Sequence, residues 1–297
     1  MMTIKTLKVL KRQAKQIIEQ YLPFRKFIEQ QQINTKFSQE ILLLKGKQKV
    51  DNQEQSILFF TTHKCASVYV ANILKELIKD TKIIPIDLGG YFWKTGVSKE
   101  IIREGHKKAL KPFGYLYAPL REPDECLTLI DNIESYQVVL MLRDPRDVLT
   151  SMYFSVGYSH IIPTAQQDVA LSAREEILQQ TIDEFVISEM PKFLKKYNDY
   201  CQELLPKSNV LLVKYEDMVT DFNSWLDTLV NFLKFDVNPK IVNKIINQAD
   251  FTVQKEDIYS HKRQVHPGDH KRKLAPETIE RLNSEFGEVL DLLGYEK

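Results

Sequence analysis

A strand, a polar loop and a helix follow one another in residues 56–78, SILFFTTHKCASVYVANILKELI, and this succession constrains the fold most strongly. The run Ile57–Phe60 is short, apolar and β-prone, as a buried parallel strand is. After Ser67 the apolar residues recur at helical spacing, so the chain changes from strand to helix within the segment TTHKCAS. The start of a helix presents unpaired N–H groups and a positive dipole end, and Lys64 adds a full charge. The loop is therefore predicted to bind a phosphate group.

Two alternatives compete with this prediction. The P-loop of nucleoside triphosphate-binding enzymes requires glycines at both ends of the loop and a Lys-Ser/Thr pair at its close. Here Lys64 precedes the small residues and the loop contains no glycine, which disfavours a nucleotide kinase of that type. The second alternative is a buried strand and an amphipathic helix whose connecting loop binds nothing, and these residues alone leave it open.

Apolar segments alternate with helical patterns along the rest of the chain. This alternation predicts an α/β fold with a mainly parallel sheet and helices on both faces. Ligands bind such sheets at the carboxyl ends of the strands. The expected strands are Ile57–Phe60, Lys82–Ile86, Tyr115–Ala118, Gln137–Leu142 and Val210–Val213. The expected helices are Ser98–Lys111, a stretch opened by a capping box at Ser172 and Glu175, Ser224–Leu233 and Ile241–Gln248.

Composition excludes several classes of protein. The 297 residues include 41 basic and 40 acidic ones, so no overall positive field favours a nucleic-acid partner. Three scattered cysteines are too few for a disulfide framework or a zinc site, and they favour a reducing compartment. No apolar run approaches the roughly 20 residues of a membrane span, and no carboxylate cluster has metal-ligand spacing. We expect a cytoplasmic protein without a metal.

Residues 1–55 form a separate region in this prediction, a helical extension and linker before a domain at 56–297. Residues 1–26 contain seven Lys or Arg against one Glu, and their apolar residues from Ile4 to Tyr21 share one helical face. A helix that docks this face on the main domain is the favoured interpretation. Weak contact with an anionic membrane surface is the alternative.

The segment Arg143-Asp-Pro-Arg-Asp147 follows the expected strand QVVLML and leads into a helix that carries Ser151. An arginine supplies a planar fork of donors and a serine supplies a hydroxyl, so the two can converge on one phosphate. The alternative is that Arg143 only pairs with Asp147. Further along, the segment His261–Lys271 and its neighbours predict a basic lid for a phosphorylated ligand.

These segments resemble, in the same order, motifs of sulfotransferases that use 3′-phosphoadenosine 5′-phosphosulfate (PAPS). TTHKCASVY resembles the phosphosulfate loop T-Y-P-K-S-G-T-T-W, and LRDPRDVLTSMY resembles R-N-P-K-D-x-x-x-S-Y. HKRQVHPGDHK resembles R-K-G-x-x-G-D-W-K, and VKYEDM resembles Y-E-D-M. The resemblance covers residues 56 to about 274. It implies a soluble, cytosolic-type enzyme with a P-loop-like phosphosulfate loop, which transfers a sulfuryl group from PAPS to a hydroxyl or amine on a small-molecule, lipid or glycan acceptor.

The resemblance also implies a role for each matched residue. Lys64 is expected at the oxygen that bridges sulfur and the departing 5′-phosphate. The expected 5′-phosphate ligands are the N–H groups of Cys65, Ala66, Ser67, Val68 and Tyr69, with the Ser67 hydroxyl. The expected 3′-phosphate ligands are Arg143, Ser151 and Arg263. The aromatic residues expected at the adenine are Tyr69, Tyr215 and Phe251.

The sequence departs from the family pattern in two ways. Ala66, Gln264 and Val265 replace residues of the motifs, which leaves a nucleotide-binding pseudoenzyme as an alternative. Tyr117 stands where the family has the histidine that accepts the proton of the acceptor, and an unperturbed tyrosine is a poor base at neutral pH. The candidates for this role are His160, which is favoured slightly because its imidazole titrates near neutral pH, and Asp87.

Overall fold

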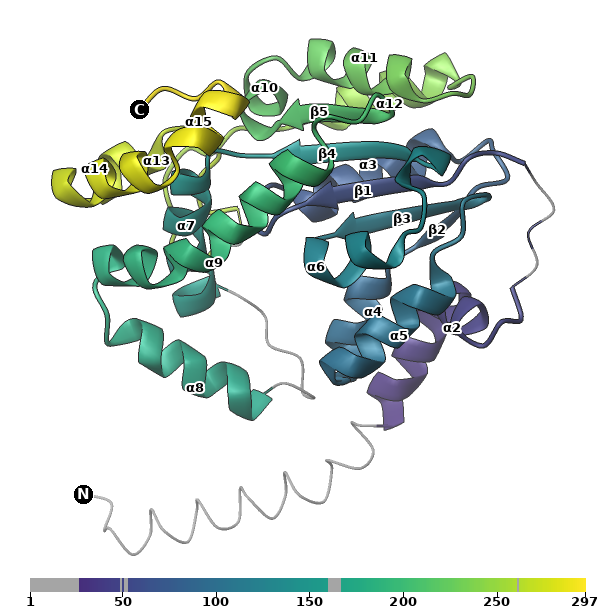
Figure 1. Ribbon diagram of the computed structural model, residues 1–297, viewed down its shortest axis with the longest axis horizontal. Coiled ribbons are helices and arrows are strands. Elements are labelled where there is room, and N and C mark those ends of the chain that lie inside the picture. The colour runs from purple at the N-terminus through teal and green to yellow at the C-terminus, as the bar shows by residue number, and fades with distance from the viewer. Residues whose placement is uncertain (1–26, 49, 51–52, 160–166, 261) are drawn as a thin grey trace, which may run out of the picture.

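The computed structural model describes residues 27–48, 50, 53–159, 167–260 and 262–297. Its five strands form one sheet in the order β2-β3-β1-β4-β5, and every pairing is parallel. Helices cover both faces of this sheet (Figure 1), so the predicted fold class is confirmed. The strands are β1 (Ile57–Thr61), β2 (Ile84–Ile86), β3 (Tyr115–Leu120), β4 (Gln137–Leu142) and β5 (Val210–Lys214).

Alternate residues of the central strand enter two separate cores, as the two-residue period of a strand requires. Ile57 and Phe59 pack with the helices α3 (Ser67–Leu77), α11 (Phe222–Phe232) and α12 (Pro239–Gln248). Leu58 and Phe60 pack on the other face. The helices that contribute there include α4 (Leu88–Thr95), α7 (Pro145–Phe154), α9 (Ile182–Glu203), α14 (Pro276–Glu285) and α15 (Gly287–Leu293).

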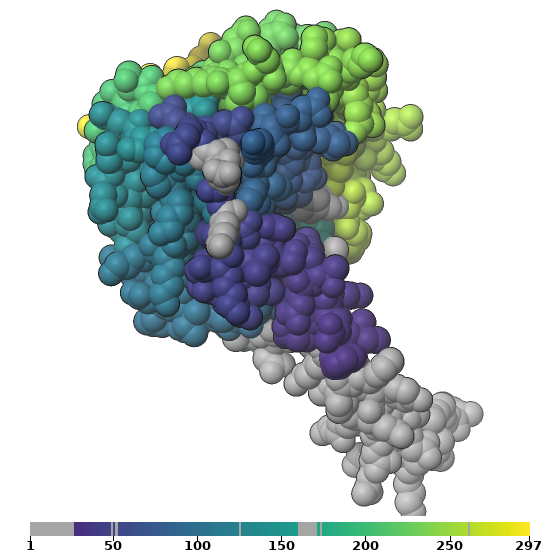
Figure 2. All heavy atoms as spheres, turned by 90° about the vertical axis from the view of Figure 1, so that its right-hand side faces the viewer, coloured from purple at the N-terminus to yellow at the C-terminus, as the bar shows by residue number. Residues whose placement is uncertain are grey.

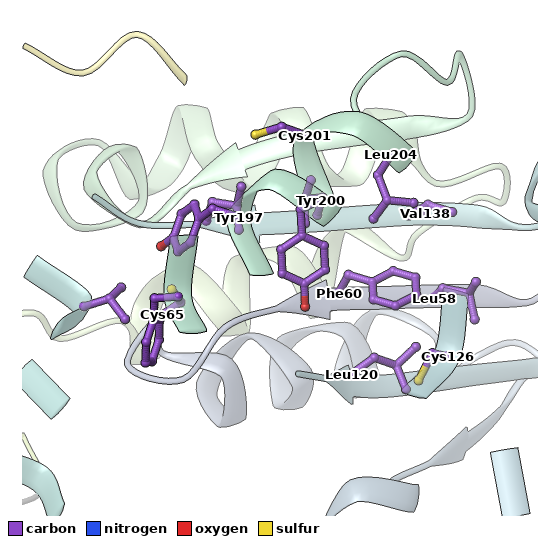
Figure 3. Close-up of a cluster of buried hydrophobic side chains, with 14 of the residues drawn as sticks. Leu58, Phe60, Cys65, Leu120, Cys126, Val138, Tyr197, Tyr200, Cys201 and Leu204 are labelled. Atoms are coloured by element: carbon purple, nitrogen blue, oxygen red, sulfur yellow. The ribbon is translucent and has the colours of Figure 1, made fainter. Parts of the chain in front are cut away.

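Two buried tyrosines of α9 fix the carboxyl ends of the central strands (Figure 3). The Tyr200 hydroxyl donates to the carbonyl oxygen of Thr61 at 2.7 Å. The Tyr197 hydroxyl donates to the carbonyl oxygen of Arg143. A buried carbonyl without a donor is costly, so these bonds stabilise the points where β1 and β4 pass into their loops. The loops that bind ligands in this type of sheet therefore begin from fixed positions.

The predicted capping box at Ser172 and Glu175 is wrong. Helix α8 (Gln167–Leu178) already contains both residues, so neither lies at a helix start. The capping box of this region is formed by Thr181 and Glu184, and it opens α9. A Ser-x-x-Glu pattern also occurs inside helices, and only the backbone shows which copy has free N–H groups to satisfy.

The described part of the N-terminal region lies against the rest of the molecule, as the purple segment of Figure 2 shows. Phe37 is buried, and the Glu40 carboxylate accepts a hydrogen bond from the N–H of Asp87 at 2.6 Å. Phe37 and Glu40 belong to the stretch around α2 (Ser38–Leu44), which packs on β2 and on α5 (Lys99–Ala109). The predicted helical face from Ile4 to Tyr21 lies outside the described residues. The remaining helices are α6 (Pro123–Cys126), α10 (Tyr215–Thr220) and α13 (Asp269–Lys273).

Candidate active site

The loop between β1 and α3 has the backbone of an anion-binding site. Lys64 and Ala66 both adopt left-handed conformations, with φ of 64° and 51°. Left-handed residues next to right-handed ones turn successive N–H groups toward one point, and α3 begins directly afterwards at Ser67. The Cys65 side chain is buried and its Sγ lies 3.1 Å from Thr62 Oγ1, so this residue offers its backbone N–H rather than its thiol. Val68 is exposed.

Lys64 carries the charge of this loop. Among the described residues, its Nζ has no hydrogen-bond or ion-pair partner. Burial, followed by the nearby charges of Arg143 and Arg263, lowers the pKa of Lys64 to about 8. The Lys64 ammonium and the guanidinium groups of Arg143 and Arg263 therefore lie close enough around the loop to repel one another. An anion with several charges fits such a place because it removes the repulsion.

Arg143 lies at the carboxyl end of β4 with 3% of its surface exposed. Its Nη1 donates to the carbonyl oxygen of Lys64 at 3.0 Å, and its guanidinium stacks on the Tyr215 ring at 4.3 Å from the centroid. Its Nε and Nη2 are buried and have no hydrogen-bond partner in the described part of the chain. A buried donor without an acceptor is costly, so this arginine is prepared for an anion. Tyr215, which directly follows β5 as the first residue of α10, supports that guanidinium.

Asp147 does more than pair with Arg143. Its carboxylate lies 3.6 Å from Arg143 Nη2, yet it accepts hydrogen bonds from the N–H of Gly268 at 2.7 Å and from the N–H of His270 at 2.9 Å. The His270 ring lies 2.7 Å from the same carboxylate. Burial opposes ionisation, but the bonds from His270 and the charge of Arg143 outweigh it and hold the pKa of Asp147 well below its usual range. Asp147 therefore fastens the C-terminal segment to α7.

Arg263 reaches the site from this C-terminal segment. It forms ion pairs with Glu256 and Asp269, and its guanidinium stacks on the Phe154 ring at 4.2 Å from the centroid. Ser151 lies one turn before Phe154 on α7 and is partly buried. The structure thus brings Lys64, Arg143 and Arg263 within electrostatic reach of one another, with Ser151 beside the ring that supports Arg263.

An aromatic cluster lies beside the loop. The Tyr69 and Phe251 rings are in edge contact at 5.7 Å between centroids. Phe222 contacts both, at 6.4 Å from Tyr69 and 5.3 Å from Phe251, and stacks on Trp225. The sequence analysis did not identify Phe222. No motif signals it, because only the packing of α11 against α3 places it there.

Tyr117 stands where the family has its histidine, and Asp87 and His160 are the two candidates for the proton acceptor. The Tyr117 hydroxyl donates to the carbonyl oxygen of Ala109 at 2.6 Å and accepts from the N–H of Lys111 at 2.9 Å. Burial raises its pKa well above the ordinary value, so Tyr117 holds α5 against β3 and does not accept protons. Asp87 caps α4 by accepting from the N–H of Gly90. His160 lies outside the described residues.

Charged residues that the sequence analysis missed lie at the carboxyl end of β3. Arg121 donates from Nε to Ser67 Oγ at 3.0 Å, so it reaches the start of α3. Glu122 follows it in the chain and lies 2.8 Å from Lys196 Nζ and 3.5 Å from His63 Nε2. The resemblance at Leu116–Pro119 directed attention to the strand itself, whereas the exposed end of the strand begins after Leu120.

Comparisons with known proteins identify the family of this chain. The sulfotransferase domain family matches residues 132–294. A 3-beta-hydroxysteroid sulfotransferase of Cavia porcellus is 23% identical over 127 residues, which cover 42% of this chain and 40% of that relative. The match thus spans less than half of the relative. The chain belongs to the sulfotransferase family.

Solved structures show the same fold. The crystal structure of mouse sulfotransferase SULT7A1 complexed with PAP aligns with a TM-score of 0.54 and 17% sequence identity. The alignment covers 86% of this chain and 94% of the mouse chain. The complex of retinol dehydratase with retinol and PAP aligns with a TM-score of 0.54 and 11% sequence identity. That alignment covers 81% of this chain and 82% of the retinol dehydratase chain. Neither the described helices nor the described His, Cys, Asp and Glu residues provide a membrane span or a metal-binding group.

Proposed function

We propose that this protein transfers a sulfuryl group from PAPS to a hydroxyl or amine acceptor. The observation that carries the proposal is a set of donors around the β1–α3 loop that have no hydrogen-bond acceptor among the described residues, namely Lys64 Nζ with Arg143 Nε and Nη2. A nucleotide with phosphates at both its 3′ and 5′ positions supplies acceptors for both residues. ATP carries its phosphates at one end only, which fits a single anion site.

The loop acts on the departing group. Sulfuryl transfer, like phosphoryl transfer, is an in-line displacement through a loose transition state, so negative charge builds on the oxygen that leaves with the 5′-phosphate. Lys64 stabilises this charge. The N–H groups from Cys65 to Tyr69, together with the Ser67 hydroxyl that Arg121 contacts, hold the phosphate. Donors fixed before the reaction need no rearrangement in the transition state, which is the source of their catalytic effect.

A second set of residues holds the 3′-phosphate and the base in this proposal. Arg143, Ser151 and Arg263 bind the 3′-phosphate, and Tyr69, Tyr215 and Phe251 bind the adenine. Arg263 must accommodate the phosphate next to two carboxylates. Glu256 is 33% exposed, whereas Asp269 is 1% exposed. The phosphate therefore displaces Glu256 and leaves Asp269 in place.

The acceptor belongs to the small molecules, lipids or glycans. The retinol and androsterone complexes of retinol dehydratase show a neighbour of this fold with apolar small molecules. A cytoplasmic location is part of the proposal, as is a division into an N-terminal extension at 1–55 and a sulfotransferase domain at 56–297. The basic N-terminal sequence supports weak contact of the extension with an anionic membrane surface.

The test compares 3′,5′-adenosine bisphosphate (PAP) with ATP-Mg in thermal unfolding. A ligand that binds only the native state adds about 2.7 kcal/mol of stability at 100 times its dissociation constant. We expect PAP to stabilise the protein and ATP-Mg to have little effect. Stabilisation by ATP-Mg alone would favour a nucleotide kinase. Labelled PAPS is then offered with phenols, sterols, lipids and glycans. PAP binding without transfer to any acceptor would favour the pseudoenzyme.

A further inference from the structure

A charged cluster lies at the carboxyl end of β3, and only one of its members, Arg121, contacts a proposed nucleotide ligand, the Ser67 hydroxyl. It consists of His63, Arg121, Glu122 and Lys196. Glu122 links the group, since its Oε1 lies 2.8 Å from Lys196 Nζ and 3.5 Å from His63 Nε2. Lys196 comes from α9 and is 5% exposed, so it is a fixed partner for this carboxylate. The His63 side chain, by contrast, is 44% exposed and can be reached by another molecule.

The position of the cluster relative to the loop identifies what can reach it. His63 directly precedes Lys64, and Arg121 donates to Ser67 Oγ, so the cluster borders the 5′-phosphate site. Arg143 and Tyr215 follow β4 and β5, on one side of β1. The cluster follows β1 and β3, on the other side. Because the nucleotide occupies the β4 side, the acceptor approaches from the β3 side, where His63 is exposed.

The ionisation of the pair leaves a carboxylate beside a neutral imidazole at pH 7. Burial opposes the charge on Glu122, but its contacts with His63 and Lys196 prevail and lower its pKa to about 2, so Glu122 stays a carboxylate. Partial desolvation and the charges of Arg121 and Lys196 lower the pKa of His63 to about 4, while Glu122 opposes this shift. The imidazole is therefore neutral at pH 7 and has a lone pair to accept a proton.

Resting on the proposed function, we propose that His63 takes the proton of the acceptor group and that Glu122, held by Lys196, positions its imidazole. Nε2 faces Glu122, which leaves Nδ1 for the acceptor. The proton of the acceptor passes to Nδ1 as the acceptor oxygen or nitrogen forms its bond to sulfur. The bond between sulfur and the 5′-phosphate oxygen breaks, and its electron pair leaves with PAP. Glu122 stabilises the imidazolium until the proton passes to water.

The test uses single-turnover transfer from PAPS to an aliphatic alcohol and to 4-nitrophenol. His63→Ala should lower the rate with the alcohol at least about 100-fold, the usual contribution of a general base. The loss should be below about tenfold with 4-nitrophenol, whose acidic hydroxyl needs less help. PAP affinity should stay within about threefold of wild type. His160→Ala serves as the comparison, and the inference is overturned if that variant shows the selective loss and His63→Ala does not.

Glu122→Gln tests the positioning role through the pH profile. Without the carboxylate, the pKa of His63 falls further, so the fall in rate at acidic pH, the acidic limb of the pH profile, should move to lower pH. The rate at pH 7 should drop about tenfold or more, because the imidazole is no longer positioned. Glu104→Gln, an exposed change on α5, should leave the limb in place. An unchanged limb in Glu122→Gln, whatever its stability, counts against the positioning role. A wild-type protein that transfers no sulfuryl group would defeat the proposed function itself, whereas transfer with an unaffected His63→Ala would defeat only this inference.

Discussion

Arg143 Nη1 donates a hydrogen bond to the carbonyl oxygen of Lys64 at 3.0 Å. This bond joins the residue after β4 to the loop after β1, so the proposed ligands of the 3′- and 5′-phosphates are held in one fixed arrangement. The two cations also repel each other, which contributes to the lowered pKa of Lys64. An anion that contacts both relieves the repulsion. The proposed nucleotide, with its two separate phosphates, would relieve this repulsion at both cations.

Removing the Lys64 amine should affect the chemical step more than binding. We expect Lys64→Ala to lower the single-turnover rate with PAPS by about 100- to 1,000-fold, the usual result of losing one transition-state donor. PAP affinity should fall less, because the backbone of the loop remains. Lys192→Ala on α9 is the matched control and should keep wild-type turnover. A Lys64→Ala enzyme with near-normal turnover would exclude Lys64 from the mechanism.

The pKa of Lys64 predicts an alkaline limit to activity. Lys64 stabilises the departing oxygen only when protonated, and burial with the charges of Arg143 and Arg263 lowers its pKa from 10.5 to about 8. Because kcat/KM reports ionisations of the free enzyme, kcat/KM for PAPS should fall above about pH 8. Bound phosphates raise the pKa, so kcat should fall only at higher pH. In Lys64→Arg the fall in kcat/KM should be absent below pH 10, since arginine stays protonated. A wild-type profile of kcat/KM that is flat to pH 9.5 would refute the assignment.

Arg143 should distinguish ligands by their 3′-phosphate. Charge-assisted hydrogen bonds contribute about 1.5–3 kcal/mol, so Arg143→Gln should weaken PAP binding about 10- to 150-fold. Adenosine 5′-phosphate, which lacks the 3′-phosphate, should lose less than about threefold. Glutamine keeps a donor for the carbonyl oxygen of Lys64, and thermal unfolding of the free variant checks that the fold survives. Equal weakening of both nucleotides in calorimetry would argue that Arg143 acts on the loop alone.

The sequence predicted the sheet well because parallel strands covered on both faces leave a local signal, a run of consecutive apolar residues such as QVVLML. Lys64 and Arg143 were found for a related reason, since each follows such a strand. Glu122 and Lys196 could not be found in this way. They are 74 residues apart, and their 2.8 Å contact depends on how α9 packs against α6, which begins after Glu122. Phe222 was missed for the same reason, as its partners Tyr69 and Phe251 come from distant segments.

Glu256 competes with the 3′-phosphate for Arg263 in our proposal. It pairs with Arg263 and lies 2.9 Å from Lys273, and both contacts lower its pKa although burial opposes them. Glu256→Gln should therefore tighten PAP binding about two- to fivefold, in line with the loss of one partly exposed ion pair. Glu285→Gln makes the same change in net charge on α14 and should have no such effect. Weaker PAP binding in Glu256→Gln would show instead that this carboxylate is needed to orient Arg263.

Ala66 occupies a position where glycine would be less strained. Its φ of 51° lies in the left-handed region, which costs a residue with a Cβ roughly 1–2 kcal/mol. Glycine adopts this conformation freely but loses more chain entropy on folding, which offsets part of the gain. Ala66→Gly should therefore raise the free energy of unfolding by about 0.5–1 kcal/mol in urea denaturation. Ala71→Gly, inside α3 and buried, should lower it by about 1 kcal/mol or more. Opposite signs for two identical substitutions five residues apart would establish the left-handed backbone of the loop in solution, and a loss of stability in both would contradict it.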